Sequence, residues 1–195
     1  MTLSSALESV HIKGLFGDHE GKEEKNLLNL SDNKNLLIIQ IVKYKNSTVS
    51  IRNIKIDNLD LENKTLSVSS NIDTRILWNG PNCWLLTSTK KELFQEIIEK
   101  FDEKNFAITN LSHSRAIIEL QGESAKEVLK KGCPYNFNIL KKNNCLNSTF
   151  NGMTVTIDIL DHNPDRIRIL TLRSFGESLY SSITDACLEF GYKSV

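Results

Sequence analysis

The sequence lacks every glycine-rich motif that proteins commonly use to hold a phosphate or a nucleotide. Its nine glycines are dispersed, and none belongs to a G-x-x-x-x-G-K-[ST] phosphate loop, a G-x-G-x-x-G dinucleotide fingerprint or a G-x-S-x-G nucleophile elbow. Without such glycines the backbone has no segment that can approach a pyrophosphate closely. The sequence therefore predicts that this chain has no NAD or FAD site of its own.

Cysteine is scarce, and the cysteines that are present are scattered. No two form a C-x-x-C pair, and no histidine stands at zinc-ligand spacing beside any of the four, Cys83, Cys133, Cys145 and Cys187. This pattern predicts no metal site. We also expect the thiols to be reduced, as in a cytoplasmic protein.

Long apolar runs and an excess of one charge are also missing. No segment approaches the roughly 20 apolar residues of a membrane span, and the opening MTLSSALESVHIKG has no signal-peptide pattern. Lys+Arg and Asp+Glu are both 24, so the formal net charge is zero. We therefore expect a cytoplasmic chain that binds neither nucleic acid nor membrane. A charge near zero also favours association within an assembly.

The chain is long enough, at 195 residues, for one sizeable core or two small fused lobes. Residues 1–34 contain one short alternating piece and the charged segment GDHEGKEEKN, which predicts an N-terminal arm and an exposed loop. Strand-like patterns begin at residue 35, so we expect a single α+β domain over 35–195. A subdivision into lobes at about 35–110 and 111–195 remains open.

Five segments have the patterns of β-strands or hairpins. LLIIQIV is an apolar run typical of a strand covered on both faces, and TVSIRNIKI alternates with a phase slip at Arg52-Asn53 that suggests a bulge. RILWNGPNCWLLTS predicts a hairpin around Asn79-Gly80-Pro81-Asn82. MTVTIDIL and RIRILTLR predict a second hairpin, with the turn at residues 161–165.

Three amphipathic helices are expected, over about 90–102, after Gly122, and over 174–190. Each begins at a possible capping box, and Gly132 stands where a left-handed cap would end the second helix; the boxes are Thr89-x-x-Glu92, Ser124-x-x-Glu127 and Ser174-x-x-Glu177. Strands that feed single helices recur along the chain. The predicted fold class is thus α+β, with helices packed on antiparallel sheets in two related lobes.

One polar cluster, Ser112-His113-Ser114-Arg115, directly precedes a predicted strand. His113 could act as a general base while Arg115 holds a carboxylate in a bidentate fork. Alternatively, the two serines satisfy backbone groups at the strand entrance, and Arg115 pairs with Glu119 on the same strand face in a structural role. No carboxylate that would orient His113 is visible nearby in the sequence. His19 and His162 lie in polar loop contexts typical of solvated imidazoles.

Two further groups of residues have alternative interpretations. Trp78 and Trp84 could be a stacking platform for a flat ligand such as a pterin, two anchors of a protein interface, or core residues. Cys133 could be a reactive thiol at a helix end, or a small buried residue. A helix C-terminus disfavours a thiolate, which supports the buried role.

Four segments in this order resemble the gamma subunits of heterotetrameric sarcosine oxidases: RILWNGPNCWLLTS, LSHSRAIIELQGESAKEVLKKGCPYNF, FNGMTVTIDIL and IRILTLRSFGESLYSSITDACLEFG. The resemblance is strongest over residues 74–192. Its most specific parts are the stretch from Ser112 to Pro134 and the closing R-S-F-x-x-S-L. The resemblance marks a set of family-signature or partner-interface residues: Trp78, Trp84, Ser112, His113, Arg115, Gly122, Gly132, Cys133, Pro134, Arg173, Ser174 and Phe175.

The resemblance implies an aminomethyltransferase-like, folate-binding-type fold and a place beside alpha, beta and delta subunits. In that family the complex demethylates sarcosine to glycine, with formaldehyde or methylene-tetrahydrofolate and hydrogen peroxide as the other products. FAD, FMN, NAD, tetrahydrofolate and zinc are implied on the other subunits and none on this one, which would be non-catalytic. A stand-alone folate-binding one-carbon transfer protein with the same fold is the alternative.

Overall fold

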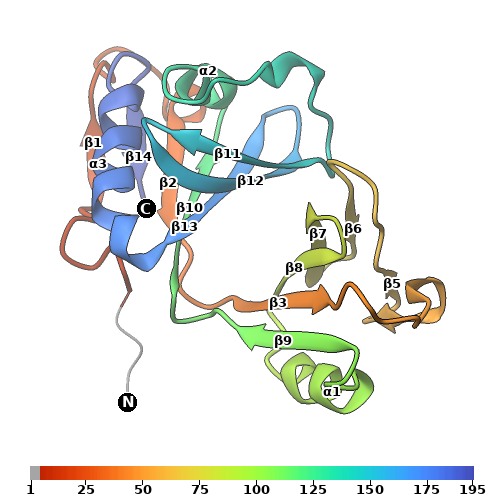
Figure 1. The fold of residues 1–195 in the computed structure, drawn as a ribbon. Helices are drawn as coiled ribbons and strands as arrows, with labels where there is room; N and C mark the ends of the chain where they lie inside the picture. The colour runs from red at the N-terminus through yellow and green to blue at the C-terminus, as the bar shows by residue number, and fades with distance from the viewer. Residues whose placement is uncertain (1–4) are drawn as a thin grey trace. The chain divides into compact units, whose positions relative to one another are not determined.

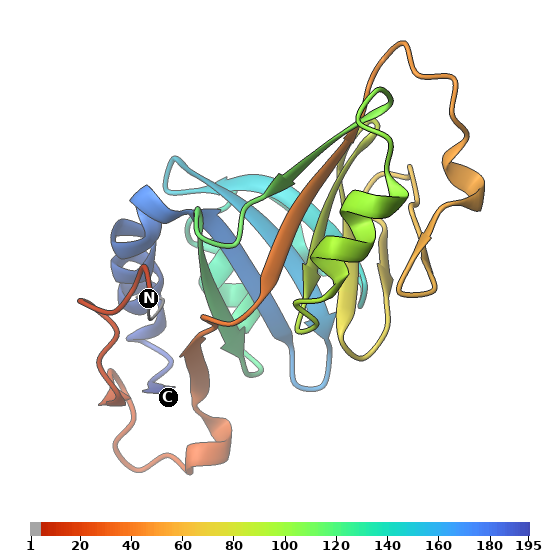
Figure 2. The same ribbon diagram turned by 90° about the horizontal axis from the view of Figure 1, so that it is seen from below.

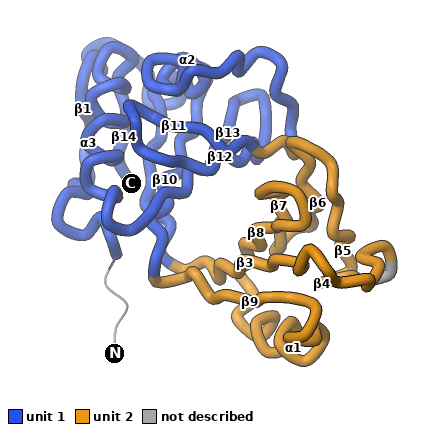
Figure 3. The backbone as a smooth tube through the Cα atoms, in the orientation of Figure 1, with its two compact units in different colours: residues 1–34, 114–142, 146–195 blue, residues 35–113, 143–145 orange. Residues whose placement is uncertain are grey.

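The computed structural model describes residues 5–195, which divide into two compact units. Unit 1 contains the described residues up to 34 together with 114–142 and 146–195, and unit 2 contains residues 35–113 and 143–145 (Figure 3). Residues on both sides of unit 2 in the sequence thus share one unit. This arrangement differs from two lobes that follow one another in the sequence, at about 35–110 and 111–195, because unit 1 contains residues from both ends of the chain.

Unit 1 is built on a seven-stranded sheet (Figure 1). Neighbouring strands pair antiparallel, apart from β14, which runs parallel to β2. The strands in sheet order are β1 (Gly14–Phe16), β14 (Tyr192–Ser194), β2 (Leu28–Asp32), β10 (Arg115–Gln121), β13 (Arg166–Leu172), β12 (Met153–Asp161) and β11 (Cys145–Phe150). The predicted hairpin of MTVTIDIL and RIRILTLR is confirmed as β12 and β13.

The α-helices of unit 1 are α2 (Ala125–Lys130) and α3 (Gly176–Cys187). α3 packs over β10 and β13 and lies beside α2. A Cβ atom at Gly176 would stand 3.0 Å from the Cβ of Ala116. Because both residues are small, the first turn of α3 can approach β10 closely. Leu179 and Ile183, on the apolar stripe of α3, are fully buried, as their helical spacing predicts.

The expectation of an N-terminal arm and exposed loop over residues 1–34 is corrected by β1 and β2, within the part of this range that the structure describes. Both strands belong to the sheet of unit 1, with β14 between them, and Leu7 and Leu30 are fully buried. The charged segment of residues 17–26 is largely exposed, as expected. The strand pattern in the sequence of this segment is weak because both strands are short and pair with β14, which lies more than 150 residues further along the chain.

Unit 2 is built on a five-stranded antiparallel sheet with a separate two-stranded ribbon. In sheet order the five strands are β6 (Val68–Ser70), β7 (Thr74–Gly80), β8 (Cys83–Ser88), β3 (Leu37–Lys43) and β9 (Phe106–Asn110), and the ribbon pairs β4 (Lys55–Ile56) with β5 (Leu59–Asp60). Figure 2 shows α1 (Leu93–Lys100) packed along one face of the five-stranded sheet. Ile97 and Trp84 are fully buried in the core between them.

The predicted hairpin around residues 79–82 is confirmed, because β7 and β8 pair in register through Trp78 and Trp84. Asn82 occupies the left-handed region, with φ of 56°, which asparagine tolerates better than most residues. The expected bulged strand TVSIRNIKI is wrong. A 3₁₀ turn (Ile51–Asn53) interrupts it, and its regular strand is the two residues of β4.

All three predicted helices are present, with shorter bounds than expected, but their capping boxes do not form. Glu92, Ser124 and Phe175 are the residues at the N-caps, and none makes a side-chain cap hydrogen bond. Two of the box side chains form hydrogen bonds with residues outside their helices instead. Thr89 donates to Asp73, 3.0 Å away, and Glu177 accepts from Ser9, 2.5 Å away. Gly132 is not in the left-handed region, so its predicted capping role is also wrong.

Candidate functional site

Two signature segments that are far apart in the sequence meet at one end of the β10–β13 pair in unit 1. Arg115 stands opposite Leu172 in the strand register, and the backbone N–H of Arg173 donates to the carbonyl oxygen of Ser114, 2.9 Å away. A 3₁₀ turn (Arg173–Phe175) then leads into α3. Ser114-Arg115 of the first motif and the R-S-F motif therefore form one continuous local structure within unit 1.

The remaining residues of the polar cluster have separate surroundings. Ser112 belongs to unit 2, where its Oγ accepts the backbone N–H of Ile38 at 2.9 Å, so it satisfies a backbone group. His113 is exposed, and the described residues give its ring no hydrogen bond. A general base would require a third group to orient the imidazole. No such group is assembled around His113 within residues 5–195.

The Arg115 guanidinium is half-buried, and burial lowers its pKa from the ordinary value. The suggested pairing of Arg115 with Glu119 is wrong. Glu119 instead accepts hydrogen bonds from Arg166 on one carboxylate oxygen, 2.7 Å away, and from Arg168 on the other, 2.9 Å away. Asn33 donates a further bond to it, at 3.0 Å.

Glu119 is thus the buried centre of a charged cluster on β10 and β13, to which Asn33, the residue after β2, also contributes. Burial alone would raise the pKa of this carboxyl, but the charge of Arg168 and the hydrogen bonds from Arg166 and Asn33 outweigh it, so the pKa lies below its ordinary range. An ion pair of this kind compensates the cost of desolvation only when its hydrogen bonds are satisfied. The cluster therefore joins β10 to β13 and to the residue that follows β2.

The two tryptophans do not form an open stacking platform. Trp84 is fully buried in unit 2, and its indole N–H donates to the carbonyl oxygen of Glu62 at 2.8 Å. Trp78 is partly exposed, and its indole N–H donates to Asn63 at 3.2 Å. A buried indole with a satisfied N–H is a core residue, so a flat ligand cannot stack between the pair.

The signature residues after β10 are structural in their geometry. Gly132 lies so close to Phe150 that a Cβ atom would stand 2.8 Å from three carbons of the ring. Gly122 has φ of 143° and approaches Leu28 in the same way. Burial raises the pKa of the Cys133 thiol to about 12, so it stays protonated near neutral pH and is a poor nucleophile.

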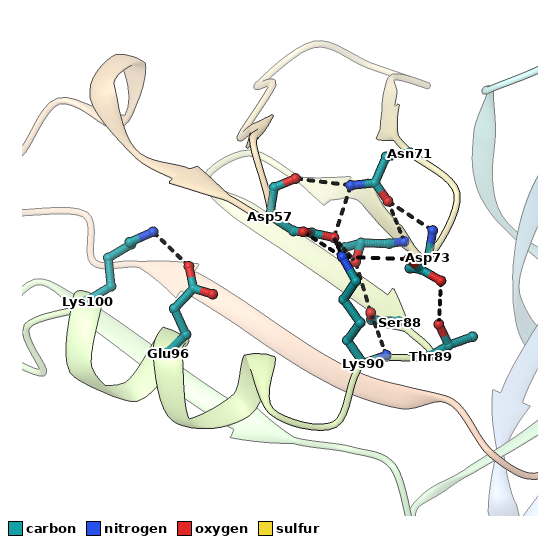
Figure 4. A network of polar contacts seen from close by, with 9 residues as sticks. Asp57, Asn71, Asp73, Ser88, Thr89, Lys90, Glu96 and Lys100 are labelled. Carbon is teal, nitrogen blue, oxygen red and sulfur yellow. Dashed lines mark hydrogen bonds and ion pairs between the residues drawn. The ribbon is translucent and has the colours of Figure 1, made fainter.

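A polar network in unit 2 escaped the sequence analysis entirely (Figure 4). Its centre is Asp57, which with Asn58 forms the two-residue turn of the β4–β5 ribbon; both residues have positive φ, 49° and 64°. This is the geometry of a type I′ hairpin turn, which asparagine and aspartate adopt more readily than other side chains. The turn carries the Asp57 carboxylate toward the sheet.

The Asp57 carboxylate is held by three donors. Lys90 lies 2.8 and 3.0 Å from its two oxygens, Thr74 donates at 2.7 Å and Asn71 at 2.9 Å. The hydrogen bond from Lys90, followed by those from Thr74 and Asn71, lowers the pKa of Asp57 from 3.8 to about 2. Ser88 extends the network by contacting Thr74 at 2.8 Å. Because the carboxylate is ionised and saturated with donors, its role in this geometry is structural.

Unit 1 has two notable surface cavities. One, of about 500 Å³, is mostly apolar and lies between the N-terminal segment and α3, with Ile12, Phe16 and Leu188 in its lining. The other, of about 710 Å³, has a mixed polar and apolar lining that includes Lys126 and the β12–β13 turn. In it Asp165 lies 2.6 Å from Nδ1 of His162 and 2.9 Å from Lys126, so His162 is more engaged than its loop context suggests.

Two searches of the described residues concern other kinds of site. Residues 5–195 contain no group of three or more His, Cys, Asp or Glu side chains placed to hold a metal ion. No helix in the same range is long and apolar enough to cross a membrane.

Comparisons of sequence and of structure both find similarity to sarcosine oxidase. No protein-family model matches this sequence. A stretch of 62 residues is 34% identical to sarcosine oxidase subunit gamma from Corynebacterium sp. (strain P-1), covering 31% of this chain. The match spans 30% of the length of that relative.

Solved structures extend the likeness over nearly the whole chain. A chain of the heterotetrameric sarcosine oxidase from Corynebacterium sp. U-96, in complex with pyrrole 2-carboxylate, matches with a TM-score of 0.80 at 20% identity. This match covers 96% of the present chain and 95% of the other. Aminomethyltransferase T of the glycine cleavage system from Bartonella henselae matches with a TM-score of 0.58 at 14% identity, covering 82% and 46%.

The fold is therefore the α+β fold shared with aminomethyltransferase T, with antiparallel sheets and few helices, as the sequence predicted. Within that class, the chain resembles sarcosine oxidase subunit gamma in the sequence of 62 residues, and a chain of heterotetrameric sarcosine oxidase in structure. The resemblance predicted from the sequence motifs is confirmed.

Proposed function

We propose that this chain is the non-catalytic gamma-type subunit of a heterotetrameric sarcosine oxidase, which oxidatively demethylates sarcosine to glycine. The observation that carries the proposal is the fold match to a chain of such an enzyme, at a TM-score of 0.80 over 96% of this chain. The named gamma-subunit relative adds support from sequence. The alpha, beta and delta subunits are the partners that the proposal assigns.

The state of the polar groups supports a structural role. The pKa of Cys133 and of Cys187 is raised to about 12 by burial, so neither thiol supplies a thiolate near neutral pH. The Asp57 and Glu119 carboxylates are ionised and occupied by several donors each. In the proposal, FAD, FMN, NAD, tetrahydrofolate and zinc belong to the companion chains, where the reaction takes place.

The proposal is tested by purifying the tagged chain from its own cells under mild conditions. Native mass spectrometry is expected to show one copy each of three companion chains, and the complex is expected to have a flavin absorption spectrum and to oxidise sarcosine. Recovery of the chain by itself, or with companions that carry no flavin and do not turn over sarcosine, would contradict the proposal.

A stand-alone folate-binding one-carbon transfer protein is the alternative, favoured only by the likeness to aminomethyltransferase T. That likeness covers 46% of the transferase, whereas the oxidase chain is covered to 95%. The alternative requires tetrahydrofolate to bind the isolated chain, so a binding measurement separates the two.

A further inference from the structure

The meeting point of the two signature segments contains a cation, Arg115, to which residues 5–195 give no acidic partner. The Arg115 guanidinium is half-buried, and within residues 5–195 its polar contact is with the carbonyl oxygen of Ser114, 3.3 Å away. Glu119, on the same face of β10, is already occupied by Arg166 and Arg168. Arginine keeps its charge under all ordinary conditions, so it cannot escape the cost of burial by losing a proton.

Two exposed apolar residues belong to the same junction of β10 with β13 and the turn that follows. Leu172 stands opposite Arg115 in the β10–β13 register, so both side chains leave the sheet on the same face, and Leu172 is 41% exposed. Phe175, in the 3₁₀ turn that follows, is 38% exposed. The exposed Arg173 lies between them in sequence. Arginine beside exposed aromatic and aliphatic groups is the composition of interface centres.

We propose that Arg115, Leu172 and Phe175, together called the Arg115 patch, dock a segment of a companion subunit that presents a carboxylate beside an apolar side chain. The inference rests on the proposed function and adds to it the surface and the chemistry of its partner. A carboxylate can accept two parallel hydrogen bonds from the planar guanidinium, and its negative charge pairs with the positive charge of Arg115. The apolar neighbour covers Leu172 and Phe175 and excludes water from the pair.

The test compares matched variants of the tagged chain, co-expressed with its companion subunits. Arg115→Glu and Leu172→Asp are expected to reduce incorporation into the complex at least about tenfold, because each places an unpaired charge in the docking site. Arg115→Lys, which keeps the charge but loses the fork, is expected to give an intermediate loss. Lys13→Glu and Ile139→Asp change exposed residues elsewhere in unit 1 and are expected to assemble normally.

A photo-crosslinking amino acid in place of Leu172 gives an independent readout that does not depend on the stability of a charge variant. The expected product joins residue 172 to a companion peptide that contains Asp or Glu beside an apolar residue. Normal assembly of Arg115→Glu, or a crosslink to a peptide without an acidic residue, would overturn the docking inference alone. Failure of the unaltered chain to assemble with any companion would instead overturn the proposed function.

Discussion

At the scale of single residues, the main structural lesson is that the strongest polar interactions join positions far apart in sequence. Asp57, Asn71, Thr74 and Lys90 form one network although they span more than 30 residues (Figure 4). Nothing local in the sequence indicates which donors surround the Asp57 carboxylate. The Asp-Asn pair between two short apolar stretches was the available signal, because it is a common two-residue hairpin turn.

Replacing Asp57 by Asn tests what the charge contributes. Asparagine tolerates the same positive φ, so the turn is preserved while the ion pair with Lys90 is lost. We expect the free energy of unfolding at pH 7 to fall by about 1–2 kcal/mol. Urea unfolding followed by tryptophan fluorescence measures it, because both tryptophans lie in unit 2 with Asp57.

The same variant has a predicted pH dependence. The folded pKa of Asp57, about 2, lies below its ordinary value of 3.8, so its stabilisation is complete above that value and is lost as the pH falls from about 5 toward 2. The difference between the unaltered chain and Asp57→Asn should therefore stay constant from pH 7 to 5 and narrow at pH 3. The exposed Asp60, 3.6 Å from Lys55, provides the control, since Asp60→Asn should cost less than about 0.5 kcal/mol. A pH-independent difference would show that the charge is not responsible.

At the scale of elements, patterns predicted which segments form helices and hairpins better than they predicted how these elements begin. The amphipathic periods of α1 and α3 were sufficient because one face of each helix is buried. The capping boxes failed because side chains such as Thr89 and Glu177 find tertiary acceptors or donors that the sequence does not reveal. A capping motif is a local preference, and packing overrides it here.

The N-terminal segment provides a prediction at this scale. If it were an arm, shortening its side chains would have little effect. Because Leu7 is fully buried in unit 1, Leu7→Ala is expected to lower the free energy of unfolding by about 2–4 kcal/mol. Ile12 lies on the same segment and is 66% exposed, so Ile12→Ala should change it by less than about 0.5 kcal/mol. Chemical denaturation followed by far-ultraviolet circular dichroism measures both, and equal effects would contradict the packing of this segment.

At the scale of the whole molecule, the proposed function makes the isolated chain a protein without a prosthetic group. Purified without companions, it is expected to be colourless and to show no heat of binding when titrated with tetrahydrofolate at micromolar concentrations. The matched control is the full complex, which is expected to show flavin absorption. A yellow, flavin-retaining preparation of the single chain would contradict the non-catalytic role, and micromolar tetrahydrofolate binding would favour the folate-binding alternative.

The sequence by itself determined the α+β class, the two hairpins, the three helices and the resemblance to the gamma subunits, because these depend on local periodicity, turn residues and short motifs. The tertiary structure decided what links distant segments: β14 between β1 and β2, the donors around Asp57 and Glu119, and the junction of Arg115 with Leu172. Such contacts depend on which strands become neighbours, and strand order is set by the burial of the whole chain. The sequence of one strand does not specify its neighbour, so the tertiary structure was needed to show that Arg115 has no acidic partner within residues 5–195.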